Sequence, residues 1–92
     1  MSAHFLLSDC FALPGRPTVL AGQVERGTIC PGLRLDLPKG HGLPHEYLTV
    51  TAVEIWRLSA ADPETTGLVL GEEVAPAALA EIFPPGSRLR FR

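Results

Sequence analysis

Apolar and polar residues alternate along three segments of the chain, which are 18–26, 33–37 and 47–57. Alternation with a period of two is typical of a β-strand that buries one of its two faces. In the middle segment every apolar residue is a leucine, and the residues between them are charged. Each of the three segments therefore predicts a β-strand with one buried face.

The longest of these segments, Tyr47–Arg57, predicts a strand whose two faces differ in composition. Unbroken alternation places one set of side chains on the first face, namely Leu48, Val50, Ala52, Glu54 and Trp56. The opposite face then carries Thr49, Thr51, Val53 and Ile55. On this pattern Glu54 and Trp56 share a face with the buried Leu48.

Shorter apolar stretches predict further strand pieces, which are His4–Leu7, Cys10–Leu13, Gly67–Leu70, Glu72–Ala75 and Arg88–Arg92. The polar pair Ser8-Asp9 separates the first piece from the second. In the last piece the alternation predicts that Leu89 and Phe91 point inward. Segment Ala77–Ile82 has the propensity for one helical turn, but a flat strand is an equal alternative. The sequence leaves that choice open.

Nine glycines and nine prolines separate these apolar runs, so the chain turns often. Loops are predicted at Pro14–Pro17, Pro38–Glu46 and Ser59–Gly67, and Gly22 predicts a bend or bulge inside its strand. Six to eight short strands, with turns about every eight to twelve residues, are typical of a barrel or a sandwich. We therefore expect an all-β fold and one domain over residues 1–92.

Composition narrows the possible functions. With 46% hydrophobic and 20% charged residues the chain is expected to be globular, and its net charge is −2. A protein that grips nucleic acid by bulk electrostatics is normally basic, so that class is not favoured, although a local pocket for one nucleotide stays open. No apolar run approaches the roughly 20 residues that a membrane-spanning helix needs, so no membrane association is expected.

The N-terminal residues lack the basic and long apolar parts of a signal peptide. The two cysteines, Cys10 and Cys30, are too few for a disulfide framework. We therefore predict two buried or half-buried free thiols in a reducing cytoplasm.

Neither a metal site nor a catalytic site is predicted. His41 and His45 stand four residues apart in a glycine- and proline-rich loop, where that spacing does not place them on one helical face. Ser8, Asp9 and Cys10 stand together, but no recognisable spacing places a base beside them. We expect a non-catalytic protein without cofactor.

The stretch from Phe11 to Gly32 carries a family resemblance. Its motifs are Phe11, Gly15-Arg16-Pro17-Thr18-Val19, Gly22-Gln23-Val24-Glu25-Arg26-Gly27 and Pro31-Gly32, followed downstream by Val53–Arg57, Gly71–Val74 and Ala80–Ile82 with Gly86. These motifs resemble the second, β-barrel domain of translation GTPases of the elongation factor Tu type. The resemblance implies a small closed antiparallel β-barrel of six to seven strands. No Gly-x-x-x-x-Gly-Lys-[Ser/Thr] loop occurs, so we expect a stand-alone barrel that binds no GTP.

The resemblance also implies binding residues. By position, a slot for the terminal adenosine of an RNA 3′ end would comprise Leu13, Gly15, Val19, Glu54 and Arg57. Phe11 and Glu73 would belong to a neighbouring pocket, which in the family receives an amino acid. In this chain Glu73 stands where the family has an amide, Ser8 where it has an acidic residue, and Ala21 where it has a threonine.

Two binding functions follow as predictions. The first is docking of a protein partner, for which an exposed apolar patch of Trp56, Phe83 and Phe91 is expected. The second is binding of an RNA 3′ end, for which a cleft between Gly15 and Arg57 is expected. The alternative to a slot is purely structural: small and aliphatic residues shape the turn, and two charged residues form a solvated pair.

Overall fold

The computed structural model describes residues 2–40, 42–57, 60–61 and 63–92. Within these residues the chain forms six strands and one short helix. In chain order they are β1 (Ala3–Phe11), β2 (Val19–Arg26), β3 (Arg34–Asp36), β4 (Tyr47–Trp56), β5 (Thr65–Leu70), α1 (Pro76–Ile82) and β6 (Arg88–Phe91).

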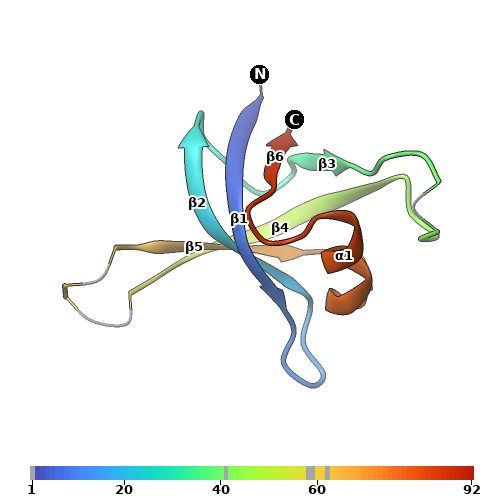
Figure 1. The fold of residues 1–92 in the computed structure, drawn as a ribbon. Helices are drawn as coiled ribbons and strands as arrows, with labels where there is room; N and C mark the ends of the chain where they lie inside the picture. Colours follow the sequence, from blue (N-terminus) through green and yellow to red (C-terminus); the bar gives the residue numbers. More distant parts are fainter. Residues whose placement is uncertain (1, 41, 58–59, 62) are drawn as a thin grey trace.

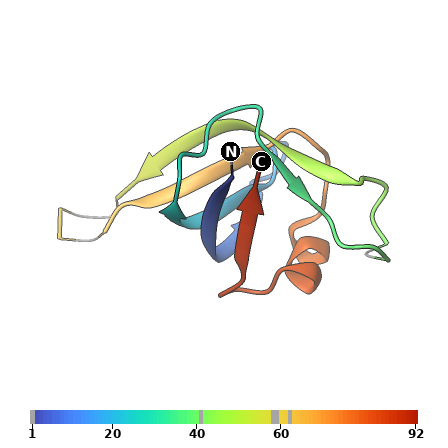
Figure 2. The ribbon, with the colours of Figure 1, turned by 90° about the horizontal axis from the view of Figure 1, so that it is seen from above.

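The strands close into one barrel in the order β1-β2-β5-β4-β3-β6, and every neighbouring pair is antiparallel (Figure 1). The first strand pairs with the last, so the sheet has no free margin between them. Both termini therefore lie at the same end of the barrel, as the view from above also shows (Figure 2). The predicted small closed antiparallel β-barrel is confirmed.

The narrowest joint of the barrel is between β3 and β6. There Arg34 and Arg92 exchange two backbone hydrogen bonds of 2.8 Å, and Leu35 pairs with Phe91. Inside this end the ring of Phe91 meets the ring of Phe5 edge-on, with 6.2 Å between the ring centroids. Both rings are fully buried, and Leu89 is buried beside them, so the inward orientation predicted for Leu89 and Phe91 is confirmed.

Strand β1 is continuous, so the predicted interruption at Ser8-Asp9 is wrong. The register between β1 and β2 shifts between Leu7 and Asp9, and this irregularity takes up the polar pair without ending the strand. Opposite it, a Cβ on Gly22 would overlap the carbonyl oxygen of Leu6. Gly22 is therefore required by a close backbone approach, and the irregularity opposite it lies on β1 rather than inside β2, where the bend or bulge was predicted.

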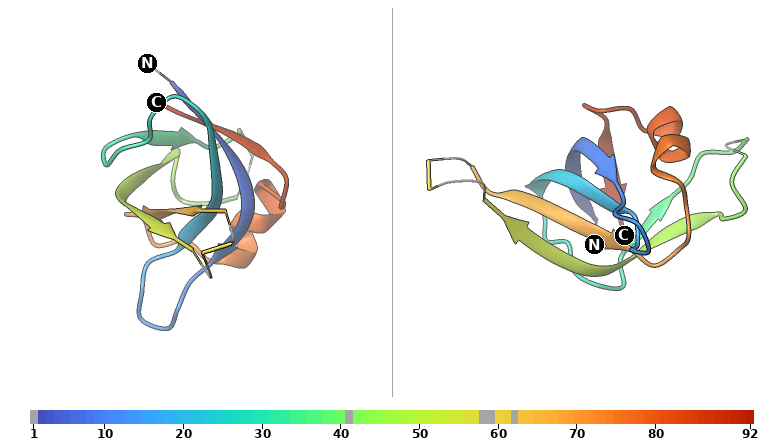
Figure 3. Two further views of the ribbon diagram at one scale, coloured as in Figure 1. Left: turned by 90° about the vertical axis from the view of Figure 1, so that its left-hand side faces the viewer. Right: turned by 90° about the horizontal axis from the view of Figure 1, so that it is seen from below.

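Strand β4 contains a second irregularity, and it overturns the predicted division of faces. The register against β5 shifts between Val50 and Ala52. As a result Val53 follows Val50 in packing against the core, whereas Ala52, Glu54 and Trp56 take the opposite, outer face. Beyond Ile55 and Thr66, where the pairing of β5 with β2 ends, β4 and β5 continue as a two-stranded arm that leaves the barrel (Figure 3).

The segments on either side of β5 also differ from the predictions. Thr65 and Thr66 belong to β5 rather than to the loop predicted for Ser59–Gly67, of which residues 59 and 62 lie outside the described residues. Glu72–Ala75 is not a strand. Segment Pro76–Ile82 is helical, with proline in the first turn, where a missing amide hydrogen costs nothing. Its buried Leu79 joins the barrel core.

Candidate functional site

The outer face of the sheet becomes apolar near the β1–β2 loop. Cross-strand register places four side chains in one row, with Phe11 on β1 opposite Val19 on β2, which is opposite Val69 on β5, which is opposite Ala52 on β4. Partners in an antiparallel sheet point to the same side. The register shift in β4 is what adds Ala52, Glu54 and Trp56 to this outer face.

Trp56 lies across the sheet rather than standing away from it. A Cβ on Gly67 would overlap the six-membered ring of Trp56, so the indole rests directly on the backbone of β5. Its ring approaches that of Phe11 with 5.9 Å between centroids and 39° between planes. Glycine at position 67 is therefore the residue that allows the two aromatic side chains to meet.

A pocket of about 360 Å³ opens beside these rings, within the usual range for small-molecule sites. Its lining is six apolar residues and two of opposite charge: Phe11, Leu13, Pro17, Val19, Trp56, Val69, Arg16 and Glu54. We call it the aromatic pocket. An aromatic wall with one guanidinium and one carboxylate can stack a flat ring while it pairs an anion and accepts a hydrogen bond.

The β1–β2 loop separates the aromatic pocket from a second pocket of about 620 Å³, which we call the acidic pocket. Arg16 and Pro17 line both pockets, and the acidic pocket also receives Glu72 and Glu73. Its floor is fixed by a buried hydroxyl, since Thr18 Oγ1 donates to the carbonyl oxygen of Val74 at 2.5 Å. The carboxylate of Glu72 accepts from the amide of Thr49 at 2.6 Å.

The structure distributes the predicted slot residues among three places. Three of the five, together with Phe11, line the aromatic pocket, and these are Leu13, Val19 and Glu54. Gly15 and Glu73 line the acidic pocket. Arg57 lines neither pocket, and its guanidinium forms an ion pair of 2.9 Å with Glu64 on the β4–β5 arm.

Sequence reasoning missed four lining residues of the aromatic pocket, which are Arg16, Pro17, Trp56 and Val69. The first two stand inside the Gly-Arg-Pro-Thr motif, so their position in the loop was available as a signal. Trp56 had a local signal, because alternation put it on the same face as Glu54, whereas Val69 had none. Their place depends on how β5 pairs with β2 and β4.

The apolar patch predicted from Trp56, Phe83 and Phe91 does not form. Phe91 has no exposed surface because β6 alternates and turns this side chain into the barrel, and Phe83 packs against the core. The large apolar side chains that are exposed instead are Leu13 at 59%, Ile55 at 56%, Tyr47 at 38% and Val24 at 37%.

The residues next to the aromatic pocket offer little nucleophilic chemistry. Cys10 is half-buried, and burial, with the nearby carboxylate of Asp9, raises the pKa of its thiol to about 11. A thiol that stays protonated at neutral pH is a poor nucleophile. The Asp9 carboxylate accepts a hydrogen bond of 2.8 Å from the backbone amide of Cys10.

No group of three or more histidine, cysteine, aspartate or glutamate side chains that suits a metal ion occurs in the part of the chain that the structure describes. His45 contacts the carbonyl oxygen of Glu73 at 3.3 Å, and His41 lies outside the described residues. Among the described helices, none is long and apolar enough to cross a membrane.

Comparison with known proteins adds no assignment to this geometry. No family model matches the chain. No solved structure matches it either.

Proposed function

We propose that this barrel is a non-catalytic binding module that receives the terminal adenosine of an RNA 3′ end in the aromatic pocket. The observation that carries the proposal is the meeting of Trp56 and Phe11 over Gly67 beside a pocket of about 360 Å³. Unpaired bases at RNA ends are recognised mainly by stacking on aromatic side chains. Such stacking contributes about 1–3 kcal/mol per base.

The two charged residues of the pocket suit the remaining parts of a nucleotide. The guanidinium of Arg16 can pair with a phosphate, and the carboxylate of Glu54 can accept from a ribose hydroxyl or the adenine amine. Neither side chain has an ion-pair partner among the described residues, so both are available to a ligand.

The resemblance to barrels of the elongation factor Tu type supports adenosine as the terminal base, because Leu13, Val19 and Glu54 line one pocket. The geometry favours a different arginine for the phosphate than the resemblance does, however. Arg57 is engaged with Glu64, so Arg16 is the residue that we expect to hold the phosphate.

The proposal is tested by titration with a trinucleotide that ends in CCA. Trp56 is the sole tryptophan, so its fluorescence reports on the pocket directly. We expect quenching on binding, and about tenfold weaker binding for Arg16→Gln and for Glu54→Gln, which corresponds to about 1.4 kcal/mol each. A trinucleotide ending in CCU tests whether the base is read.

Arg57→Gln is the matched control, because it removes a guanidinium of the same kind outside the pocket. We expect binding to be unchanged in that variant. Absence of any fluorescence or amide-shift response at millimolar trinucleotide would end the proposal. A loss for Arg57→Gln with none for Arg16→Gln would show that the ligand lies elsewhere.

Docking of a protein partner is the second candidate, and one observation favours it. Ile55 is 56% exposed at the base of the β4–β5 arm, which projects from the barrel (Figure 3). A projecting arm with an exposed aliphatic side chain is a suitable contact for another protein. Recovery of a partner by the wild-type chain and its loss with Ile55→Ser would support this candidate.

A further inference from the structure

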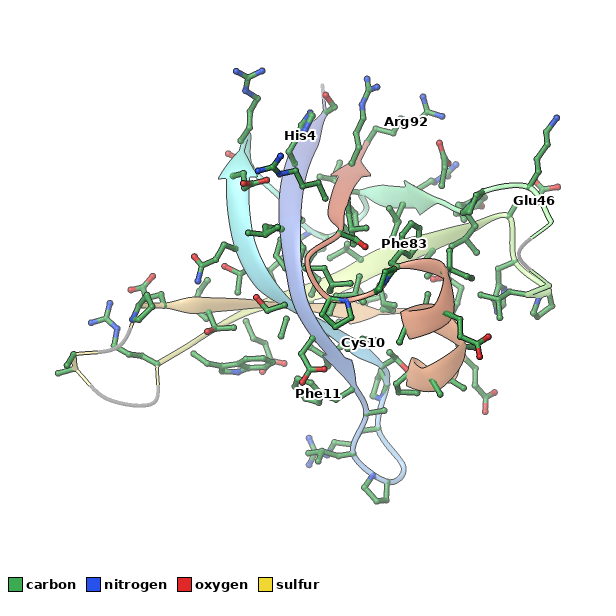
Figure 4. All side chains as sticks on the ribbon, in the orientation of Figure 1. His4, Cys10, Phe11, Glu46, Phe83 and Arg92 are labelled. Atoms are coloured by element: carbon green, nitrogen blue, oxygen red, sulfur yellow. The ribbon has the colours of Figure 1, made fainter. Side chains whose placement is uncertain are left out.

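Basic residues are concentrated at one end of a chain whose net charge is −2. Five of the eight lysines and arginines lie at the end of β2, in β3, in β6 or directly after β6, and these are Arg26, Arg34, Arg88, Arg90 and Arg92. In Figure 4 the labelled side chains of His4 and Arg92 lie at this end, and Phe11 lies at the other end of β1.

Three of these basic-end residues form a row across three strands. His4 on β1 is the register partner of Arg26 on β2 and also of Arg90 on β6. The flanking Phe5 and Leu89 are buried, so the row points to the outside of the barrel. We call Arg26, His4 and Arg90 the basic row.

Register partners on one face of a regular antiparallel sheet have Cβ atoms about 4.5–5.5 Å apart, which applies to His4 and Arg90. The β1–β2 register shifts directly after the pair of His4 and Arg26, so Arg26 lies beside an irregularity. Each arginine of the basic row therefore flanks the same imidazole from one side, and all three side chains present hydrogen-bond donors to the same patch of solvent. Arg26 and Arg90 stand on opposite sides of β1, two strand spacings or about 10 Å apart, so each can meet a different phosphate of one strand.

The other arginines at this end already have partners, and those of the row do not. Arg88 pairs with Glu25 at 3.2 Å, Arg92 with Asp36, and Arg34 lies 4.5 Å from the ring centroid of Tyr47. Within the described residues neither Arg26 nor Arg90 makes an ion pair. The chain has ten carboxylates, yet the two in this region are already engaged with Arg88 and Arg92.

We propose that the basic row binds phosphate groups of the RNA strand whose 3′ end occupies the aromatic pocket. The choice of RNA as the anion rests on the proposed function. The basic row itself is a surface separate from the aromatic pocket. Arginine forks match phosphate oxygens in geometry and charge. Phe11 follows His4 by seven residues on one strand, which corresponds to about 23 Å at the usual rise.

A single strand of moderate length spans that distance, since barrels of similar size hold about 4–16 nucleotides. The exposed carboxylate of Asp9 lies between the two sites on β1. The RNA backbone is therefore expected to contact the barrel at its two ends rather than along the whole of β1.

The test compares a CCA trinucleotide with a ten-nucleotide strand that has the same 3′ end. We expect the longer strand to bind more tightly, and its affinity to fall more steeply with salt. Neutralising two phosphates on a single strand adds about 1.4 to the salt slope, or about a sevenfold loss of affinity between 50 and 200 mM salt. In the double variant Arg26→Gln/Arg90→Gln the ten-nucleotide strand should lose its tighter binding and its steeper salt dependence. The trinucleotide should bind to this variant as it binds to the wild-type chain.

Arg88→Gln is the control, because it removes an arginine of the same strand that is already paired with Glu25. If the ten-nucleotide strand still binds the double variant more tightly than the trinucleotide does, by the full wild-type ratio, the inference about the basic row is wrong. Binding of the trinucleotide would still support the aromatic pocket. If the trinucleotide fails to bind but the ten-nucleotide strand binds through Arg26 and Arg90, the pocket proposal fails and the basic row stands. Equal competition by polyglutamate would overturn RNA in favour of an acidic protein surface.

Discussion

The end of the barrel that carries both termini and the end that carries the β1–β2 loop differ in which face of the sheet bears their aromatic side chains. At the termini, Phe5 and Phe91 turn inward and seal the core, and the outer face bears arginines. At the loop, Phe11 and Trp56 lie on the outer face, and carboxylates line the pockets beside them. Aromatic residues thus stabilise the fold at one end and are available to a ligand at the other.

The difference arises from register rather than from residue type. Phenylalanines at 5 and 11 belong to the same strand, but a register shift lies between them, after Leu7. Position 5 faces the core, whereas position 11 pairs with Val19 on the outer face. Equivalent substitutions at the two ends are therefore expected to have unequal effects.

The largest expected effect is that of Phe91→Ala at the closed end. This change leaves a cavity against Phe5 and should lower the free energy of unfolding by about 3–5 kcal/mol, as measured by urea denaturation. Leu13→Ala at the loop end removes a side chain that is 59% exposed and should cost less than about 0.5 kcal/mol. Comparable losses for the two variants would contradict the division between the ends.

Gly67→Ala tests the packing of the Trp56 indole on the backbone of β5. The new methyl group overlaps the indole, so the ring must leave the sheet, at a cost of about 1–3 kcal/mol. We expect a red-shifted tryptophan emission and weaker binding of the CCA trinucleotide. Gly71→Ala is the control, because its methyl would meet Thr51 instead, and an unchanged emission there is expected.

The two thiols give a smaller, pH-dependent difference. The pKa of Cys10 is raised from 9.0 to about 11 in the folded chain, so the protonated thiol is favoured by folding. Stability is therefore fully present below about pH 9 and is lost as pH rises from about 9 towards about 11. Unfolding in urea across this range should show a shallower decline for Cys10→Ser than for wild type.

Cys30→Ser serves as the matched thiol control, since Cys30 is exposed, so the burial predicted for both thiols is wrong for this one. Its stability should decline with pH in parallel with the wild-type protein. In alkylation at pH 8 we expect Cys30 to react well before Cys10. Faster alkylation of Cys10 would contradict its burial.

The smallest expected effect concerns the arginine-rich face. Glu25→Gln removes the ion pair with Arg88, whose side chain is 74% exposed, and should cost only about 0.2–1 kcal/mol. Thermal unfolding at low and high salt measures this contribution, which should diminish as salt screens the pair. A cost that persists undiminished at high salt would point to a contact other than charge.

The sequence by itself determined the strands that bury one face over several residues. The alternation of β6 was predictable, because side-chain periodicity reports burial directly, whereas β2 buries Leu20, Ala21 and Gly22 in succession. The closed antiparallel barrel was implied by the family resemblance rather than by periodicity. Leu13, Val19 and Glu54 were also grouped correctly with one another in a single pocket.

Only the tertiary structure decided which face Trp56 takes and which arginine lines the pocket. A shift between Val50 and Ala52 depends on pairing with β5, which local alternation does not record, and one residue of slip reverses every following side chain. The sequence of Ala77–Ile82 was compatible with a helix or a strand, and burial of Leu79 in the core accompanies the helix. Likewise Arg57 and Arg16 differ by their neighbours, since only Arg57 has Glu64 within reach.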